Sequence, residues 1–430
     1  MKRNTSFVFS LAMAATVLAA CSGSHRGSGG GGGGGGSQKA QLTITMTSSA
    51  PVSLTSVSVL SANVGITGIT LNPLTGNPVP VTLTPAILPV DLMRLQTDTA
   101  FLASITVPAQ TYNSATITLG ALSLTLDNQS GSIINGTCAT ASVCQVTLPA
   151  GSAQVTVAPF PLTLIAAQKT GVSLNLDLNS ALTFGGGTLA LNFSAANVFT
   201  VTTLPRTGTL SGAVDEVRDF VGTVTAITSS SVTVQSASGI SLQFILPASP
   251  AIEDPQGLCS ALNLTCLVAN KTVVSVDGTV NTDGTLSLLS ADLLDATPRD
   301  ELEGTVLSNG TAGQFFLVLA NKVVASGNTT LAAANAGDSF LVTLNNPTFI
   351  VDSDELFNNA SYPTSTVSAM FSSEANLIDG QDVVVHVTVA SGSAAGKNQA
   401  VTTDQVRLRF TRTTGTIVSV SGQSFTLSSV

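Results

Sequence analysis

The chain has 430 residues and a formal net charge of -9, and 43% of its residues are hydrophobic. Charged residues make up only 9% of the chain, against about 25% in a typical soluble domain. Binding to nucleic acid depends on Lys and Arg side chains that neutralise phosphates, and this acidic chain has no basic run. We therefore expect no nucleic-acid partner.

The first residues predict export. Lys2 and Arg3 precede an apolar segment at 7–20, which is too short to span roughly 30 Å of hydrocarbon as a stable helix. The pattern is typical of a secretory signal peptide at residues 1–20. This segment ends at Leu18-Ala19-Ala20-Cys21.

This tetrapeptide resembles the lipobox of bacterial lipoproteins, and the alternative is an ordinary signal peptide with a chance cysteine. The resemblance implies cleavage before Cys21 and a lipid on its thiol, which would make the membrane a partner. Ser22 in place of aspartate implies passage to the outer membrane, with the periplasmic or surface face left open. Residues 21–39, with eight consecutive glycines, are expected to be a flexible tether.

From residue 40 the dominant hydrophobic period is two. Leu174, Leu176 and Leu178 alternate with polar residues, which is typical of a strand with one buried face. Further strands are predicted at 41–47, 53–60, 115–126, 145–148, 153–157 and 189–193. Only residues 91–102 favour a helical turn. We expect an all-β chain in which residues 40–205 form an antiparallel β-sandwich.

After a predicted linker at 206–219, the chain repeats itself. The repeated openings are Gly222-Thr223-Val224, Gly304-Thr305-Val306 and Gly415-Thr416-Ile417. The first two units converge on predicted strand pairs, 273–280 with 285–294 and 382–389 with 403–410. We expect tandem small β-barrel-like units of oligonucleotide/oligosaccharide-binding shape. They are expected at 220–302, at 303–411 with an insertion, and at 412–430 as the start of a third, truncated repeat in a fragment of a longer array.

Two resemblances cover most of the chain. Residues 40–200, above all the stretch 90–120, resemble the bacterial lipoprotein domain of unknown function 4382. Residues from 220 onward resemble the domain of unknown function 5666, with its Gly-Thr-Val opening and the stretch "VSVDGTVNTDGTLSL" at 274–288. The resemblances imply architecture and a lipoprotein context, and they supply no catalytic residue.

The cysteines also indicate export. If Cys21 is lipidated, four cysteines remain as two close pairs, Cys138 with Cys144 and Cys259 with Cys266. Four thiols allow three pairings. Proximity favours two local disulfides, each contributing about 2 kcal/mol in the chain-entropy model. A metal site is disfavoured because the pairs lie far apart in the sequence without a nearby histidine.

Residues for catalysis are scarce. Of the two histidines, His25 lies in the tether and His386 lies in a predicted strand. We expect His386 to face solvent; the alternative is a His-Asp dyad or a metal ligand. No nucleophile, zinc-protease or phosphate-loop motif is present in the sequence, so we predict no catalytic residue and no enzyme.

The carboxylates form two clusters. Asp352, Asp354 and Glu355 are weak calcium candidates, because calcium prefers several oxygen ligands at closely spaced positions. The second cluster surrounds Pro298 and comprises Asp292, Asp295, Asp300, Glu301 and Glu303. Both clusters are expected to be mainly solvated charge, and no other cofactor is expected.

Aromatic residues do not favour glycan stacking. The chain has no tryptophan, and Tyr112 is expected to be a packing residue in a sandwich corner rather than a sugar platform. We therefore expect a non-enzymatic, lipid-anchored envelope protein that serves as a display or interaction module for an unknown protein or envelope partner. The alternative is a periplasmic module that binds calcium or a small ligand.

Overall fold

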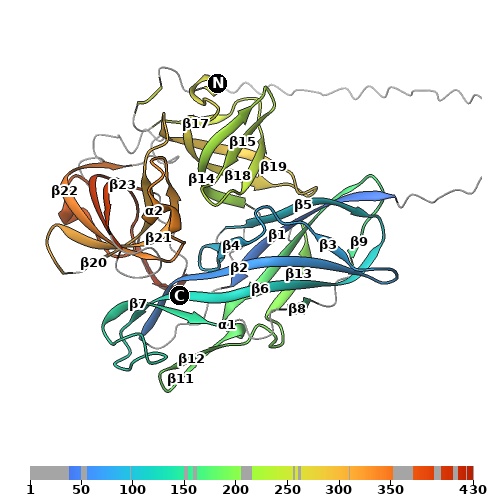
Figure 1. Cartoon of the computed structure of the whole chain (residues 1–430), viewed down its shortest axis with the longest axis horizontal. Coiled ribbons are helices and arrows are strands. Elements are labelled where there is room, and N and C mark those ends of the chain that lie inside the picture. The colour runs from blue at the N-terminus through green and yellow to red at the C-terminus, as the bar shows by residue number, and fades with distance from the viewer. Residues whose placement is uncertain are drawn as a thin grey trace, which may run out of the picture. The chain divides into compact units, whose positions relative to one another are not determined.

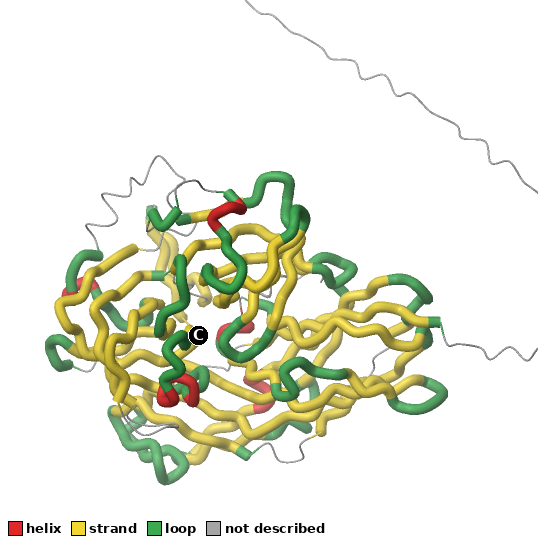
Figure 2. Tube along the Cα trace, turned by 45° about the horizontal axis from the view of Figure 1, so that its top comes forward, coloured by secondary structure: helices red, strands yellow, loops and turns green. Residues whose placement is uncertain are grey.

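The computed structural model describes thirteen stretches of the chain, and they consist mainly of β-strands (Figures 1 and 2). These stretches are 38–49, 56–96, 98–149, 154–157, 162–204, 216–254, 257–259, 263–308, 310–351, 371–391, 399–409, 415–422 and 424–429. Figure 2 shows only short helical segments between the strands. The prediction of an all-β chain is confirmed.

The first sheet of the N-terminal sandwich has four strands in the order β13-β10-β1-β5. Their bounds are β1 (Lys39–Ser49), β5 (Ala100–Pro108), β10 (Lys169–Asp177) and β13 (Phe199–Thr203). Strand β1 pairs with β5 in antiparallel orientation but with β10 in parallel orientation. The prediction of a purely antiparallel sandwich is wrong at this pair. The chain forms the whole second sheet between β1 and β10, and such a long crossover permits parallel pairing.

The second sheet has seven strands and is built on the long strands β2 (Val57–Pro73) and β6 (Thr111–Asn128). The other strands are β3 (Val79–Val81), β4 (Leu88–Asp91), β7 (Ser142–Leu148), β8 (Gln154–Val157) and β9 (Leu162–Thr163). Alternate apolar residues of both sheets, such as Leu42, Ile44 and Ile117, form one buried core. This core is the physical reason for the period of two in the sequence.

Short elements complete the sandwich. They are the 3-10 turn η1 (Arg94–Gln96), α1 (Leu178–Ala181), β11 (Leu182–Gly185) and β12 (Thr188–Leu191). The helical turn expected within 91–102 is η1. Leu178, expected to end a strand, instead opens α1, because the Asp177 side chain accepts a hydrogen bond from the Asn179 backbone N–H and caps the turn.

Tyr112 lies at a corner of the sandwich. Its side chain is fully buried, and its hydroxyl donates a hydrogen bond to the Pro108 carbonyl over 2.9 Å. A tyrosine that bonds back to the backbone a few residues upstream is a known corner device of β-sandwiches. Tyr112 therefore has the packing role expected from the sequence.

The next sheet, which we call barrel 1, contains six strands and closes on itself. They are β14 (Glu216–Ile227), β15 (Ser231–Gln235), β16 (Ser241–Ile245), β17 (Ala251–Glu253), β18 (Val273–Val280) and β19 (Leu286–Asp295). The order is β16-β15-β14-β18-β19, and a parallel pairing of β16 with β19 closes the ring. The turn η2 (Leu264–Cys266) precedes β18. A separate core that includes Val224, Val234 and Phe244 fills barrel 1.

Barrel 2 repeats this arrangement. It is a closed barrel in the order β20-β21-β22-β24-β23, and its parallel pair is β22 with β24 (Figure 1). Its elements are β20 (Glu301–Ser308), β21 (Gln314–Val323), α2 (Thr329–Ala333), β22 (Ser339–Val351), η4 (Glu374–Asn376), β23 (Asp382–Ser391) and β24 (Gln399–Leu408). Part of the extra length expected in this unit is the segment with α2. Barrel 2 is therefore a closed barrel of the kind expected, and in barrel 1 the β16–β19 pairing joins the two ends of a curved sheet.

Two of the expected boundaries fall inside strands. Strand β14 begins at Glu216, so residues 216–219 belong to a strand rather than to the linker. Strand β20 begins at Glu301, two residues before the expected start of the second unit. Both segments contain charged side chains, and charge near a boundary in the sequence resembles a solvated connection.

The glycine of the repeated opening has a steric cause. A Cβ atom at Gly222 would overlap the carbonyl of Gln235, and one at Gly304 would overlap the carbonyl of Val318. Each glycine thus lets its strand approach the next strand of the barrel closely. The third opening starts a hairpin formed by β25 (Gly415–Ser421) and β26 (Ser424–Ser429).

Candidate functional site

Four of the predicted site residues lie outside the described residues. They are the lipidation candidate Cys21 and the calcium candidates Asp352, Asp354 and Glu355. Lipidation and calcium binding therefore stay predictions. Among the described residues, no group of three or more His, Cys, Asp or Glu side chains could hold a metal ion.

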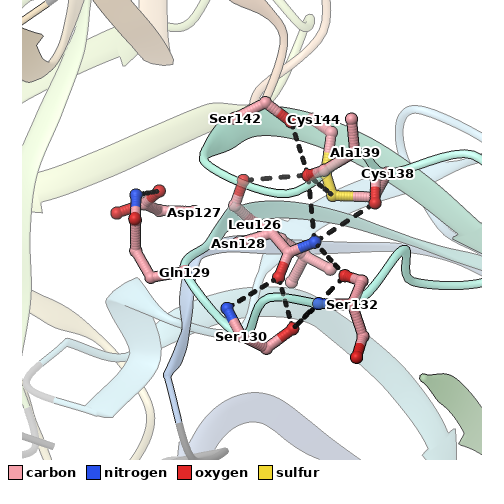
Figure 3. Close-up of a disulfide and its surroundings, with 10 residues drawn as sticks. All are labelled: Leu126, Asp127, Asn128, Gln129, Ser130, Ser132, Cys138, Ala139, Ser142 and Cys144. Carbon is pink, nitrogen blue, oxygen red and sulfur yellow. Dashed lines mark hydrogen bonds between the residues drawn. A yellow bond between two sulfur atoms is a disulfide. The ribbon is translucent and has the colours of Figure 1, made fainter. Parts of the chain in front are cut away.

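The cysteines pair locally, as expected. Cys138 is joined to Cys144 and Cys259 to Cys266, with Cα atoms 5.4 and 5.7 Å apart. The sequence analysis missed Asn128, whose buried side chain supports the first disulfide loop (Figure 3). Its amide Nδ2 donates to the carbonyls of Ser132, Cys138 and Ala139 over 2.8, 3.1 and 2.9 Å. These bonds and the disulfide indicate a structural role for the loop.

His386 forms a pair with an aspartate from the neighbouring strand. Its Nδ1 lies 2.6 Å from Oδ1 of Asp404, which is contributed by β24. Asp382, which shares a strand face with His386, instead accepts a hydrogen bond from Thr305 over 2.9 Å. The His386 side chain is 23% exposed and that of Asp404 is 49% exposed. The pair therefore lies at the surface of barrel 2.

The acidic cluster around Pro298 is not solvated, and this corrects the expectation for four of its five members. The exposed fractions are 3% for Asp292, 7% for Asp295, 2% for Glu301 and 5% for Glu303. These residues come from the end of β19 and the start of β20, where side chains of barrel 1 and barrel 2 meet. Arg299, from the same segment, pairs with two of them. Two further counterions, Arg407 and Arg409, come from β24 and the residue after it, more than a hundred residues later in the sequence.

Arg409 connects the two barrels. Its guanidinium Nη2 donates to Oγ of Ser275 over 2.7 Å and to Oδ1 of Asp219 over 3.2 Å, both in barrel 1. Its Nη1 lies 3.7 Å from Oδ2 of Asp292, and its Nε lies 3.7 Å from Oε1 of Glu303 in barrel 2. The Arg409 side chain is only 1% exposed, so these charges interact with little solvent screening.

A second buried group is centred on Glu301. Its Oε1 lies 2.8 Å from Nη2 of Arg407 and 3.1 Å from Nη2 of Arg299. Arg299 also places its Nε 2.8 Å from Oδ1 of Asp295. Oε2 of Glu301 has no hydrogen-bond partner among the residues that the structure describes. Burial raises the pKa of Glu301 from 4.5 to about 8, although the charge of Arg407 opposes this rise.

Arg94, in η1, brings the sandwich into the same charged region. Burial alone would lower the pKa of Arg94, but the charges of Glu303, Asp98 and Asp219 raise it above its ordinary value. Burial also raises the pKa of Glu303, against the opposing charges of Arg409 and Arg94. We call the region where the sandwich, barrel 1 and barrel 2 meet the junction. Because each of its charged side chains shifts the pKa of others, its arginines and acids form one electrostatic system.

Polar contacts also join the sandwich directly to barrel 2. Asn63 Nδ2 donates to the Ala336 carbonyl over 2.6 Å, and Thr125 Oγ1 donates to the Gly337 carbonyl over 2.5 Å. Gln145 Nε2 donates to Oδ1 of Asp338 over 3.1 Å. These contacts come from β2, β6 and β7 and meet the loop that follows α2.

A cavity of about 400 Å³ lies at the junction, lined by residues of η1, β5, β14 and β21 and of the loop after α2. Phe101, Phe220 and Ile240 supply apolar walls, and Arg94 and Lys322 supply cationic groups. Lys322 Nζ donates to the Leu331 carbonyl over 2.9 Å, and burial lowers the pKa of Lys322. The volume of the cavity is within the range of small-molecule binding sites.

Comparison of the chain with protein-family models, with curated proteins and with solved structures found no match. Within the described residues, no helix combines the length and the apolar character needed to cross a membrane. The geometry of the junction suits two tasks, namely holding the three β-domains together and enclosing a small amphipathic molecule.

Proposed function

We propose that the chain is a non-enzymatic, lipid-anchored protein of the bacterial outer membrane, whose β-domains act together as an interaction module. The observation that carries this proposal is the order of features in the sequence. The lipobox-like Leu18-Ala19-Ala20-Cys21 is followed by the glycine-rich segment expected to be a tether, and strand β1 begins at Lys39, the last residue of that segment. A lipid on Cys21 would hold the sandwich and the two barrels, which we call the body of the protein, at the membrane. The tether would let this body reach a partner.

The junction supports the proposal that the β-domains act together as one interaction module. Buried ion pairs and hydrogen bonds link the sandwich, barrel 1 and barrel 2, so binding residues on different domains are held at fixed separations. A preorganised surface loses less conformational entropy on binding than freely jointed domains do.

The test is metabolic labelling of cells with a radioactive fatty acid. We expect label on the wild-type protein and on a Ser22→Ala control, and none on the Cys21→Ser variant. Proteinase treatment of intact cells then assigns the face of the membrane to which the body belongs. Equal labelling of Cys21→Ser and wild type would rule out anchoring through this residue.

A second candidate, binding of a small ligand, is favoured by the junction cavity. We expect native mass spectrometry of the protein, purified from its own envelope, to show a bound molecule of a few hundred daltons, in line with the size of the cavity. An Ala320→Phe change, which places a ring at the cavity wall, should abolish this added mass. An adduct that survives the change would place the ligand elsewhere.

A further inference from the structure

Backbone hydrogen bonds bring several loops to the end of the sandwich where β1 begins. The Ala167 N–H donates to the Lys39 carbonyl over 2.8 Å, and the Leu74 N–H donates to the Thr111 carbonyl over 3.0 Å. Thr111 opens β6, three residues after Pro108, which lies opposite Lys39 in the register of β5 with β1. We call this end of the sandwich the tether end, and Figure 1 shows β3 and β9 near it.

The tether end exposes two large apolar side chains. Leu74 is 67% exposed, the highest value for a large apolar side chain among the described residues of the sandwich, and Ile165 is 55% exposed. The neighbouring Leu164 is only 2% exposed, so this loop turns one apolar side chain into the core and the next one outward. Single exposed apolar residues are common on soluble proteins. The meaning of this pair therefore depends on the charge around it and on what is attached nearby.

The charge at the tether end differs from that of the whole chain, whose formal net charge is -9. Lys39 is the only charged residue in the four segments that form this end, which are 38–39, 73–79, 108–112 and 162–168. At the opposite end of the sandwich, Asp127 is the second-last residue of β6 and Asp177 is the last residue of β10. Membrane surfaces with anionic lipids attract lysine and repel carboxylates. Charge therefore favours the tether end as the end that faces lipid.

The proposed anchor lies a short length of chain away. Lys39 is 18 residues after Cys21, and a glycine-rich chain of this length has a root-mean-square reach of roughly 21 to 25 Å. A short flexible linker gives an effective local concentration in about the millimolar range, at which weak contacts form. A lipid on Cys21 would thus keep Leu74 and Ile165 within reach of the membrane surface.

We propose that the tether end of the sandwich docks on the lipid surface, with Leu74 and Ile165 inserted among the headgroups and Lys39 beside anionic lipid. Docking holds the opposite end of the sandwich away from the membrane, where a partner can reach it. This inference rests on the proposed lipid anchor at Cys21. Flotation with vesicles reports anchoring, whereas quenching of a tryptophan by lipid reports docking, so the two proposals can fail separately.

The absence of tryptophan from the chain permits a direct test. Thr75→Trp places one indole beside Leu74, and Thr140→Trp places one at an exposed position of the opposite end, which controls for the affinity of indole itself for membranes. Each lipidated variant is reconstituted in vesicles of phosphatidylethanolamine, phosphatidylglycerol and acyl-chain-brominated phosphatidylcholine. We expect bromine to lower the fluorescence of Thr75→Trp at least twofold and to leave that of Thr140→Trp unchanged.

Two exposed isoleucines test the apolar contact itself. Ile165→Ser, made in the Thr75→Trp chain, should reduce the quenching at least twofold. Ile133→Ser removes a side chain of similar exposure, 59%, at the opposite end of the sandwich and should leave the quenching unchanged. Circular dichroism checks that both variants are folded.

Three results would overturn the docking proposal. A chain that floats with the vesicles while Thr75→Trp is not quenched is anchored but not docked. Equal quenching of Thr75→Trp and Thr140→Trp would show that the body contacts lipid without a preferred end. A chain that does not float with the vesicles would refute the anchor and, with it, the docking that depends on the anchor.

Discussion

Replacing Arg409 by methionine is expected to lower the free energy of unfolding by about 3 to 5 kcal/mol, the usual cost of removing one partner from a buried ion group. The change keeps much of the side-chain volume but leaves the carboxylates of Asp219, Asp292 and Glu303 without this cation. Urea unfolding followed by circular dichroism measures the loss, because the chain has no tryptophan for fluorescence.

The position of Arg409 gives the experiment a second readout. Because its partners lie in both barrels, hydrogen exchange should become faster in β14 and in β20 together. Lys271→Met, which removes an exposed cation, is the matched control and should change stability by no more than about 0.5 kcal/mol. Arg409→Lys keeps the positive charge but lacks the planar guanidinium group. It should lower the free energy of unfolding by less than Arg409→Met does. A loss below about 1 kcal/mol for Arg409→Met would contradict a role in joining the barrels.

The body of the protein is also expected to be less stable at about pH 8 than at about pH 5, and Glu301 should account for much of the difference. Burial raises the pKa of this carboxyl from 4.5 to about 8. Between these values the folded protein holds a proton that the unfolded chain has released. The stability linked to that proton is therefore complete below about pH 4.5 and is lost as the pH rises through about 8.

Glu301→Gln tests this assignment, because glutamine has nearly the same shape and does not titrate. We expect the stability difference between the two pH values to shrink by about 2 kcal/mol. A smaller dependence of the same sign should remain, since burial also raises the pKa of Glu303 and of Asp382. An unchanged profile in Glu301→Gln would assign the effect to another group.

The strands could be predicted well because their signal is local. Residues 273–280 were expected as a strand from their pattern, and β18 has these bounds. The repeated Gly-Thr-Val opening predicted the barrels because the same close approach of two strands recurs at Gly222 and Gly304. Local disulfides could be predicted for a similar reason, since both partners lie within one loop.

The junction could not be predicted, because its signal is not local. Asp295 and Glu301 stand beside Pro298 in a charged segment, which resembles a solvated turn. Their burial depends on Arg407, which the closing strand of barrel 2 brings back after more than a hundred residues. The cavity has the same origin, because Arg94 and Lys322 reach it from η1 and β21. Alternation of apolar and polar residues indicates which face of a strand is buried. It does not indicate which domain covers that face.

The place of β1 in its sheet determines how the body responds to mechanical force. A pull on the N-terminal side of the body acts first on β1, which lies between β10 and β5. Nine residue pairs join β1 to β10 and eight join it to β5. Extraction of β1 along its own axis loads the hydrogen bonds on both edges at the same time, rather than opening them one after another. Strand β1, the first described strand after the glycine run at 29–36, is thus suited to bear tension without peeling from the sheet.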